Sequence, residues 1–562
     1  MTNPKQQLVE LILSYADVTG SHVAVEQGER SVNYPELRER VRERASLLAA
    51  LGAPHTFVAL ERRKTPEFIV DFLAVLLIDG IVIPLDPDLP PERRARFLDL
   101  MQPRFLLGDS DIARRTVRSE TPQRATDEAG WVYFTSGSTG VPKPVLGSAV
   151  GARSFVDWFI PEFSVRPSDR FAFLTDVSFE ASLRDIFGPL AAGATVVLPT
   201  SDDTATPQTT VTWLAGAEIS VVTVIPSVAR GWLGRDWTVC PTVRAAFFVG
   251  EPLSRDVLAG WQQTFPATAI RVNSYGATES GQGTIYRRVA PDEAITERVP
   301  AGRPVPGTRF CLVQPDAVLD AELVRQTLSR PASSGEIVIV SRACSLGYLG
   351  LPDENRARFA HLGGGVTGYR TGDLGTVDEN GELVVIGRAD AEVKINGVRV
   401  HPAEVTRALQ DQPAIADGFV IATRTGETAY LTGYVVPAEG CPLSIPKLRR
   451  GLMDTLPVAM IPTEFVELAE LPRTRTGKVD RAALAGLAEQ APPAADAPSF
   501  GEVAATIRDI AVGIEEHALL PAHPTGLEAL LDAMSEDRVP ADALDTGALS
   551  GGERAGRVTF GR

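Results

Sequence analysis

Residues 133–143 read Tyr133-Phe134-Thr135-Ser136-Gly137-Ser138-Thr139-Gly140-Val141-Pro142-Lys143, within and after an apolar run that starts at Trp131. Glycines and hydroxyl residues in such a loop can turn backbone N–H groups toward a polyphosphate, and the lysine adds a positive charge. The spacing differs from the P-loop pattern G-x-x-x-x-G-K-[ST]. Taken alone, the stretch fits either a phosphate-binding loop or an ordinary Ser/Thr/Gly-rich surface turn. Residues further along the chain decide between the two.

Size and composition define the broad class of the protein. At 562 residues the chain exceeds the usual size of one hydrophobic core, so we expect two or more domains. Apolar residues make up 44% and charged residues 22%, which is ordinary for a soluble globular protein. The formal net charge of −16 argues against nonspecific nucleic-acid binding, which needs a basic surface.

Other features favour a cytoplasmic enzyme. No apolar run is long enough for a membrane span, and the N-terminal residues lack the pattern of a signal peptide. The four cysteines, Cys240, Cys311, Cys344 and Cys441, are scattered and form no C-x-x-C pair. This spacing indicates buried thiols in a reducing compartment rather than a disulfide or metal framework. We therefore expect neither a membrane nor a nucleic-acid partner.

Helix and strand patterns alternate along the first part of the chain. Helices are predicted over 35–51, 66–79 and 90–101, and strands over 57–60, 80–85, 194–198, 220–225, 245–249 and 269–272. This alternation is typical of an α/β fold with parallel strands. From about residue 307 the pattern changes to strand, turn and strand, as at 335–340 and 382–386.

The expected fold class is therefore α/β, with three parts along the chain. Residues 1–387 are predicted to form a large N-terminal domain of layered, mostly parallel sheets with helices and a β-rich subdomain. Residues 388–488 are predicted to form a small α+β C-terminal domain. Residues 489–562 begin with the Pro/Ala-rich linker EQAPPAADAP and continue as a partly helical tail.

The stretch at 133–143 is followed by further motifs in a fixed order. They are Asn273–Glu279 (NSYGATE), Gly335–Ile337 (GEI), Gly347–Leu349 (GYL), Tyr369–Leu374 (YRTGDL), Gly387–Asp390 (GRAD), Val393–Gly397 (VKING) and Thr476–Arg481 (TGKVDR). This ordered set resembles the adenylate-forming superfamily, specifically the amino-acid adenylation domains of nonribosomal peptide synthetases. Weaker matches lie at Val32–Leu37 and Pro84–Pro87, so the resemblance covers about residues 8–485.

The resemblance implies a reaction in which a carboxylate oxygen attacks the α-phosphorus of ATP and pyrophosphate leaves. Because two anions must meet, cationic groups and N–H donors are needed around them. The loop 135–143 is implied to hold the β- and γ-phosphates, with Thr139 and Lys143 taking part in catalysis. Glu279 is implied to bind Mg²⁺, a hard cation suited to carboxylate and phosphate oxygens. ATP and Mg²⁺ are thus the expected cofactors.

The other nucleotide contacts also follow from the matched motifs. Asp373 is implied to accept both ribose hydroxyls, Tyr275 to stack on adenine and Arg388 to lie near the ribose and phosphate. The remaining nucleotide-binding positions are Thr135, Ser136, Gly137, Ser138, Gly140, Asn273, Gly276 and Thr278. Read in isolation, Asp373 fits an Asx turn and Glu279 the first turn of a helix.

Lys478 is expected to carry most of the rate. In the family the matching lysine bridges the substrate carboxylate and the ribose-phosphate oxygens, and a flexible ammonium can follow moving charge. Read in isolation, it is a solvated lysine on a surface turn. Asp390 is implied to be a hinge about which the small C-terminal domain moves, and Lys394 and Gly397 to line a tunnel for an attacking thiol.

The substrate pocket is predicted from the segment around Glu180, which stands where the family has an aspartate that binds the α-amino group. A carboxylate there favours an amino substrate. Its extra methylene either leaves less room for the substrate or suits an amine displaced from the α position. Arg184 is expected to meet a substrate carboxylate, favouring an acidic or otherwise polar amino acid; alternatively, it pairs with Glu180 at i,i+4. The remaining pocket positions are Ala181, Thr223, Phe247, Val249, Gly250, Ser274, Gln282 and Gly283.

Some residues depart from the family pattern. Pro144 stands where a glycine is usual, Ala277 replaces a proline, and Val400–Glu404 (VHPAE) is closer to forms in stand-alone acyl ligases. After Ser550 the chain is too short for the helices of a carrier domain, so a discrete phosphopantetheinylated carrier protein is the expected partner. The predicted activity is amino-acid adenylation followed by carrier loading. The alternatives are an acyl- or aryl-CoA ligase and a non-catalytic nucleotide-binding relative.

Overall fold

The computed structural model describes residues 3–109, 112–115, 127–135, 142–233, 239–290, 293, 299–389, 393–395, 398–425, 428–438, 441–472, 479 and 483–484. Almost all of them belong to one compact unit, residues 1–443 with 448–489. A second unit comprises 444–447 and 490–562. The predicted tail, residues 489–562, lies outside the described residues.

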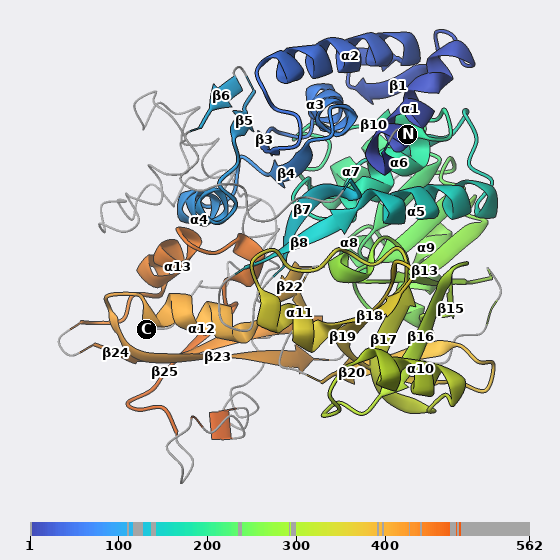
Figure 1. The fold of residues 1–562 in the computed structure, drawn as a ribbon. Coiled ribbons are helices and arrows are strands. Elements are labelled where there is room, and N and C mark those ends of the chain that lie inside the picture. Colours follow the sequence, from blue (N-terminus) through green and yellow to red (C-terminus); the bar gives the residue numbers. More distant parts are fainter. Residues whose placement is uncertain are drawn as a thin grey trace, which may run out of the picture. The chain divides into compact units, whose positions relative to one another are not determined.

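Among the described residues, the largest sheet has nine strands and a parallel centre (Figure 1). In sheet order these strands are β15 (Arg303–Pro304), β14 (Ile285–Arg288), β13 (Ile270–Tyr275), β12 (Ala245–Val249), β11 (Val221–Val224), β9 (Arg170–Ala172), β10 (Thr195–Val197), β1 (Val23–Gln27) and β2 (Arg30–Asn33). All neighbours from β13 to β1 are parallel, and the outer pairs are antiparallel.

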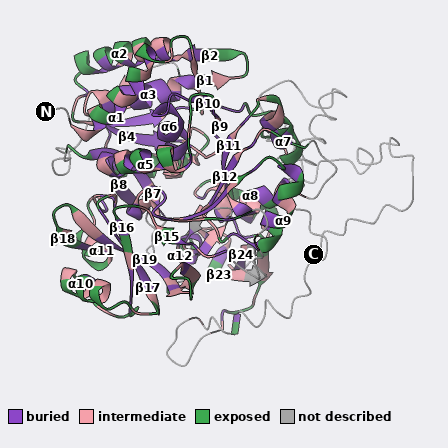
Figure 2. Cartoon of the chain, turned by 90° about the vertical axis from the view of Figure 1, so that its right-hand side faces the viewer, coloured by how far each residue is buried: buried purple, intermediate pink, exposed green. Residues whose placement is uncertain are grey.

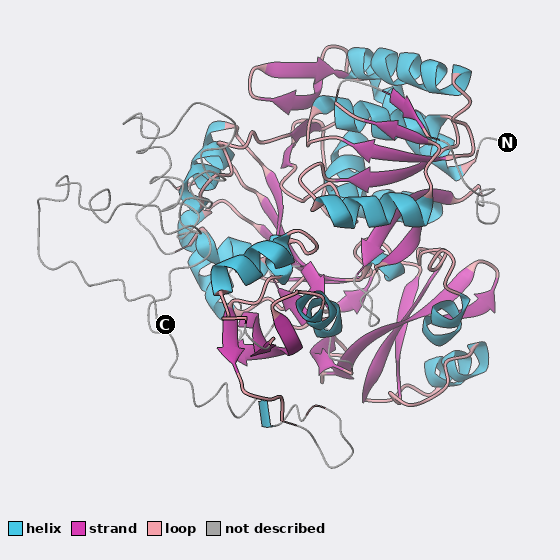
Figure 3. Ribbon diagram, turned by 90° about the vertical axis from the view of Figure 1, so that its left-hand side faces the viewer, coloured by secondary structure: helices cyan, strands magenta, loops and turns pink. Residues whose placement is uncertain are grey.

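A six-stranded sheet repeats this design. Its described strands, in order, are β6 (Ile112–Arg114), β5 (Phe105–Leu107), β3 (Phe57–Glu61), β4 (Ile81–Leu85), β7 (Ala129–Thr135) and β8 (Lys143–Ser148). The four central strands are parallel, while β6 and β8 are antiparallel edges. Figure 3 shows helices flanking the strands, as expected for parallel strands joined by helical crossovers.

The helices are amphipathic or wholly apolar according to their position. They are α1 (Pro4–Ser14), α2 (Tyr34–Ala50), α3 (Pro66–Leu77), α4 (Pro91–Met101), α5 (Ala149–Glu162), α6 (Ser182–Leu190), α7 (Pro207–Gly216), α8 (Pro226–Gly231), α9 (Arg255–Thr264), α10 (Ala321–Ser329), α11 (Pro352–Arg358), α12 (Pro402–Gln410) and α13 (Ile445–Met453). α2 starts where the Asn33 side chain accepts a hydrogen bond from the Glu36 N–H, with Pro35 in the first turn.

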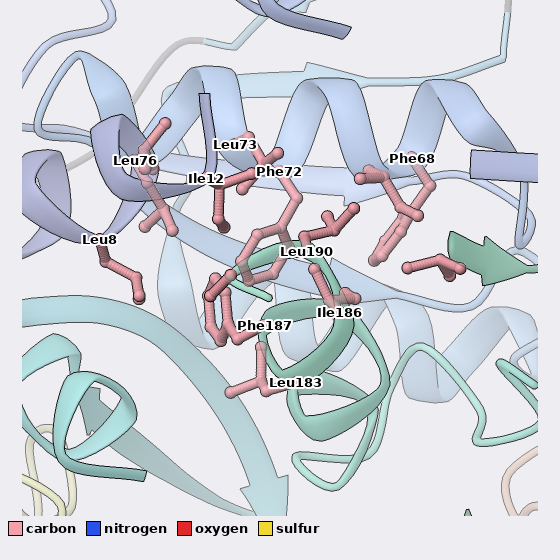
Figure 4. Close-up of a cluster of buried hydrophobic side chains, with 14 of the residues drawn as sticks. Leu8, Ile12, Phe68, Phe72, Leu73, Leu76, Leu183, Ile186, Phe187 and Leu190 are labelled. Carbon is pink, nitrogen blue, oxygen red and sulfur yellow. The ribbon is translucent and has the colours of Figure 1, made fainter. Parts of the chain in front are cut away.

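One hydrophobic core joins the inner faces of the two parallel sheets. It contains α3 and α6, whose side chains Phe72 and Phe187 meet edge to face at 6.0 Å between ring centroids (Figure 4). The strands of the nine-stranded sheet alternate between this core and a second one under α7 and α9: Phe247 faces the first and Phe248 the second. Both faces are therefore buried, and Figure 2 shows these strands largely in the colour of buried residues.

The remaining strands form three smaller sheets. Their described members are β16 (Thr308–Val313), β17 (Ser334–Ser341), β19 (Val366–Val377), β18 (Phe359–Gly363) and β20 (Leu383–Arg388) in one sheet, β21 (Val393–Ile395) with β22 (Val398–Val400), and β23 (Ile415–Thr425), β24 (Thr428–Pro437) and β25 (Glu464–Glu467) in the last. The last sheet and α12 share a core of their own.

The predicted α/β class with mostly parallel sheets is confirmed. Every helix and strand predicted before residue 300 is present, with ends that differ by at most a few residues. The predicted strand at 335–340 lies within β17, and the predicted strand at 382–386 overlaps β20. The boundaries at 387 and 488 stay predictions.

Candidate active site

Predicted site residues gather where parallel strands of the two large sheets end. Thr135 is the last residue of β7, Val249 the last of β12 and Tyr275 the last of β13. In open α/β sheets, ligands bind beyond the carboxyl ends of the strands, where loops replace the regular ladder. Across from these ends, β19 and β20 contribute Asp373 and Arg388 as directly paired residues.

The predicted phosphate end is built around a buried carboxylate. Glu279 lies in the short helix Thr278–Ser280 and is 1% exposed. Its Oε1 accepts hydrogen bonds from the Thr135 hydroxyl at 3.1 Å and the Tyr348 hydroxyl at 3.0 Å. Two hydroxyl donors on one oxygen fix the direction of the Glu279 carboxylate. The structure thus brings Thr135 and Glu279 together, as the resemblance implies.

Lys143 opens β8 opposite Thr135 and is 8% exposed. Its ammonium donates to Glu354 Oε2 at 2.7 Å and lies 5.4 Å from the Tyr348 ring centroid. The lysine predicted to contact phosphate therefore already has an anionic partner on α11. Ser136, Gly137, Ser138, Thr139 and Gly140 lie outside the described residues.

The predicted ribose end centres on Asp373, which is 6% exposed. Its Oδ2 accepts the Tyr275 hydroxyl at 2.6 Å and its Oδ1 accepts Arg388 Nη1 at 2.8 Å, while its own N–H donates to Thr371 Oγ1. Each carboxylate oxygen has two acceptor positions, so capacity for further donors is left. All three predicted residues line a cavity of about 330 Å³.

Two other predicted nucleotide residues have definite positions. Asn273 and Gly276 line the same cavity, and the Asn273 amide donates to the carbonyls of Val299 and Pro300 at 3.2 and 2.9 Å. Asn273 thus holds the chain that follows β14 against β13. Thr278 lies in a neighbouring cavity of about 400 Å³.

This second cavity contains most of the predicted substrate pocket. The predicted pocket residues in its wall are Glu180, Ala181, Arg184, Val249, Gly250, Ser274, Gln282 and Gly283. Thr223 and Phe247 are 4% and 2% exposed and, among the described residues, are not part of this wall. Phe247 packs on the Phe159 ring at 5.0 Å between centroids, and Thr223 lies on β11.

Glu180 and Arg184 are close enough to influence each other electrostatically. Burial raises the pKa of Glu180 to about 8; Arg184 opposes this shift and Glu279 adds to it. Burial lowers the pKa of Arg184. In the part of the chain that the structure describes, the two side chains form no direct ion pair, so the i,i+4 pairing that the sequence allowed is absent.

The predicted hinge and tunnel residues are only partly described. Lys394 lies on β21 and lines both cavities. Asp390, Gly397 and Lys478 lie outside the described residues, so their predicted roles stay predictions.

Tyr348 and Glu354 are functional candidates that the sequence analysis assigned no role. Tyr348 belongs to the quoted motif Gly347–Leu349, and that position was the available signal; nothing in the local sequence marks Glu354. Pro144, which departs from the family pattern, lies near the start of the edge strand β8. The Pro144 carbonyl accepts the Leu349 N–H at 2.9 Å, so the outer side of β8 is bonded to the segment 346–349. Proline is tolerated near the start of a strand, where its missing N–H interrupts few ladder bonds.

A half-buried lysine, Lys64, supports the loop that carries Glu180. The Lys64 ammonium donates to the Leu174 carbonyl at 2.8 Å. Burial lowers its pKa, against the opposing influence of Asp176, Asp185 and Asp86. Burial and the neighbouring Asp176 raise the pKa of Asp86 to about 6, and burial raises that of Asp185 to about 6. One cation is thus shared by three acids beneath the substrate cavity.

Replacing Lys64 with methionine is expected to lower the free energy of unfolding by about 2 kcal/mol, because the Leu174 carbonyl loses a charged donor and the acids lose their shared cation. Urea denaturation measures the change. Lys447→Met, at an exposed position of α13, is the matched control and is expected to leave it unaltered. Equal stability of the two variants would contradict a supporting role for Lys64.

Comparison with known proteins places this arrangement in a family. The family model described as AMP-binding enzyme matches residues 14–349. The chain belongs to the AMP-binding enzyme family, which confirms the resemblance inferred from the motifs. Within the described residues, no helix is long and apolar enough to cross a membrane.

Two relatives and one solved structure illustrate the similarity. The isonitrile lipopeptide synthase of Streptomyces coeruleorubidus is 31% identical over 87% of this chain and 34% of its own length. The chain thus spans about a third of that relative. Syringomycin synthase SyrB1 of Pseudomonas syringae pv. syringae is 28% identical over 85% of this chain and 81% of its own length. The Vibrio cholerae adenylation domain AlmE, solved with glycyl-adenosine-5'-phosphate, superposes with a TM-score of 0.71 over 86% of this chain and 98% of its own, at 19% identity.

Proposed function

We propose that this protein activates the carboxylate of an amino acid with ATP and then transfers the acyl group to the phosphopantetheine thiol of a separate carrier protein. The observation that carries the proposal is a shared wall. Gly250, Ser274, Gly276 and Lys394 line both the cavity that contains Asp373 and the cavity that contains Glu180. A nucleotide in the first cavity would therefore meet an amino acid in the second.

In this reaction each described residue has a task that its contacts suit. Asp373, oriented by Tyr275 and Arg388, accepts the ribose hydroxyls and so positions the α-phosphate. Glu180 binds the substrate amine and directs the carboxylate toward that phosphate. As the carboxylate oxygen attacks, the bond from the α-phosphorus to the bridging oxygen breaks and pyrophosphate leaves. Lys478 is proposed to follow the charge between carboxylate and phosphate.

The residues around Glu279 fit a magnesium ion. Mg²⁺ in nucleotide sites is held by one or two carboxylates together with phosphate oxygens and water. Glu279 supplies one carboxylate in a fixed direction through Thr135 and Tyr348, and no cluster of three acidic, His or Cys ligands exists among the described residues. When bound, the ion would neutralise phosphate charge. The described residues themselves orient Glu279 and bind the substrate.

A cytoplasmic site of action remains part of the proposal. All four cysteines are free, as expected in a reducing compartment. The carrier is proposed to be a discrete protein, and the substrate a polar amino acid or one with a displaced amine, because Glu180 and Arg184 line the cavity.

Two assays test the proposal. Substrate-dependent exchange of pyrophosphate into ATP, across an amino-acid panel, is expected to identify at least one amino acid. Product trapping then compares a phosphopantetheinylated carrier with free CoA as thiol. Transfer to the carrier supports the proposal, whereas efficient transfer to CoA would favour the acyl-CoA ligase. Absence of exchange with every amino and aryl acid would favour a non-catalytic binding protein.

The raised pKa of Glu180 predicts a pH dependence of substrate binding. Below about pH 8 its carboxyl group is mostly protonated in the free protein and cannot bind an ammonium group as an anion. As the pH rises toward 8, the ionised fraction grows, and the KM for the amino acid is expected to fall by up to about tenfold per pH unit before levelling off.

Exchange kinetics between pH 6.5 and 8.5 measure this effect. In Glu180→Gln the KM is expected to be higher and nearly independent of pH, because the titrating group is gone. Asp86 and Asp185 titrate near 6 and remain in this variant, so they supply the internal control. The same pH slope in both proteins would show that Glu180 does not bind the amine.

A further inference from the structure

Arg184 is a buried cation in the wall of the substrate cavity. It lies in the first turn of α6, one turn after Glu180, and is 6% exposed. Its guanidinium reaches across to β13 and to the loop after it. There, Nη2 is 3.4 Å from Ser274 Oγ, and a Cβ atom added to Gly283 would lie 3.1 Å from the same nitrogen. The guanidinium carbon also lies 5.7 Å from the Phe155 ring centroid.

The hydrogen-bonding capacity of Arg184 is largely unused. Within the described chain, its Nε has no hydrogen-bond partner, and its bond to Ser274 is long. Gln282, also in the cavity wall, donates from Nε2 to the Glu180 carbonyl, while its Oε1 has no partner among the described residues. Buried polar atoms are normally paired, so two such side chains in one wall indicate that a polar ligand completes them.

The charge of Arg184 is not neutralised locally either. Among the described residues, neither Glu180 nor Asp185 forms an ion pair with it, although both act on it over a longer distance. Asp185 instead accepts the Thr175 hydroxyl at 2.7 Å. Burying a guanidinium without a direct anion is costly, and a carboxylate is the anion whose geometry matches its forked donors.

The cavity wall indicates where such an anion would sit. Thr135, whose hydroxyl donates to Glu279, lines the same cavity as Glu180 and Arg184. The reacting carboxylate of an amino acid must be on the Glu279 side, next to the phosphates. With its amine at Glu180, the side chain of the substrate points toward Arg184.

We propose that the cavity selects an amino acid whose side chain ends in a second carboxylate, and that Arg184 binds this distal group. This inference rests on the proposed adenylation function and narrows its substrate to dicarboxylic amino acids. Gly283 contributes by its lack of a side chain, because a Cβ atom in its left-handed conformation (φ +54°) would crowd the guanidinium. Arg184 is thus a specificity-determining residue rather than the i,i+4 partner of Glu180.

The test compares dicarboxylic amino acids with their uncharged partners in ATP–pyrophosphate exchange. The panel contains aspartate and asparagine, glutamate and glutamine, the corresponding β-amino acids, and leucine and phenylalanine. The wild-type protein is expected to prefer one dicarboxylate over its amide by about 100-fold in kcat/KM, because an amide leaves the buried cation unpaired. In Arg184→Met this preference for the acid over its amide is expected to disappear.

Controls separate the possible failures. Arg153→Met replaces a surface arginine that pairs with Asp157, and it is expected to keep the wild-type preference. Arg184→Lys is expected to retain part of the preference for the dicarboxylate, since lysine keeps the positive charge but lacks the forked pair of donors. Two results would overturn the inference while leaving adenylation intact. One is wild-type exchange that is highest with a neutral amino acid. The other is an equal loss of kcat/KM for the acid and for its amide in Arg184→Met. No exchange with any amino acid would overturn the proposed function itself.

Discussion

Replacing Lys478 with alanine is expected to lower the rate of adenylate formation by about three orders of magnitude while leaving ATP binding nearly unchanged. The attacking carboxylate and the α-phosphate are both anions, so their approach needs a cation that is engaged most strongly in the transition state. Among the predicted cations, Lys143 is already paired with Glu354, and Arg388 with Asp373. Lys478 is proposed to stabilise the moving negative charge.

Exchange kinetics measure the rate of adenylate formation, and equilibrium binding measures the affinity for ATP. Lys447→Ala, at an exposed lysine of α13, is the matched control and is expected to keep wild-type exchange. A Lys478→Ala protein that exchanges pyrophosphate at a near wild-type rate would contradict the assigned role. If Lys478→Ala weakened ATP binding to the same extent as pyrophosphate exchange, Lys478 would bind ATP in the ground state rather than act in the transition state.

The fold was predictable because its signals are local. Short apolar runs separated by helical patterns, such as those at 57–60 and 66–79, indicate parallel strands and crossover helices, and both occur as β3 and α3. The alternation of Phe247 and Phe248 between two cores explains why such strands are apolar throughout. The same burial on both faces explains why Phe247 packs in a core although its position matched the family's pocket.

The site was predictable only in part because its contacts join distant segments. The motifs marked Thr135, Glu279 and Asp373, and the structure brings each beside another predicted residue. The pairing of Lys143 with Glu354, across more than 200 positions, has no local signal. Sequence spacing suggested an ion pair between Glu180 and Arg184, but the guanidinium extends toward Ser274 and Gly283 instead. Sequence spacing predicts which residues are neighbours on a helix, but it does not predict the direction in which a long side chain extends.

The charges in the two cavities form a consistent pattern. At the proposed nucleotide end, hydroxyl donors hold the carboxylates of Asp373 and Glu279 in fixed directions. At the proposed amino-acid end, burial raises the pKa of Glu180, and Arg184 Nε has no hydrogen-bond partner among the described residues. The proposed nucleotide end is thus organised in advance, whereas we expect the substrate to complete the amino-acid end.

Replacing Asp373 with asparagine is expected to lower kcat/KM for ATP by at least about 100-fold. The carboxylate is bound by Tyr275 and Arg388 and retains acceptor capacity toward the cavity. An amide keeps the shape but replaces one acceptor oxygen with a donor nitrogen, which faces donors from Tyr275 or Arg388. Arg388, whose side chain is 8% exposed, also loses the carboxylate that it contacts at 2.8 Å. The loss should appear mainly in the KM for ATP.

Asp99→Asn, on the exposed face of α4, is the matched control and is expected to behave as the wild type. Because Asp373 also anchors Arg388, the thermal midpoint must be measured with and without ATP. The expected result is a modest loss of intrinsic stability together with loss of most of the stabilisation that ATP gives the wild type. If Asp373→Asn kept full ATP stabilisation and a wild-type KM, the cavity of Asp373 would not be the ribose site, and the nucleotide would have to bind elsewhere.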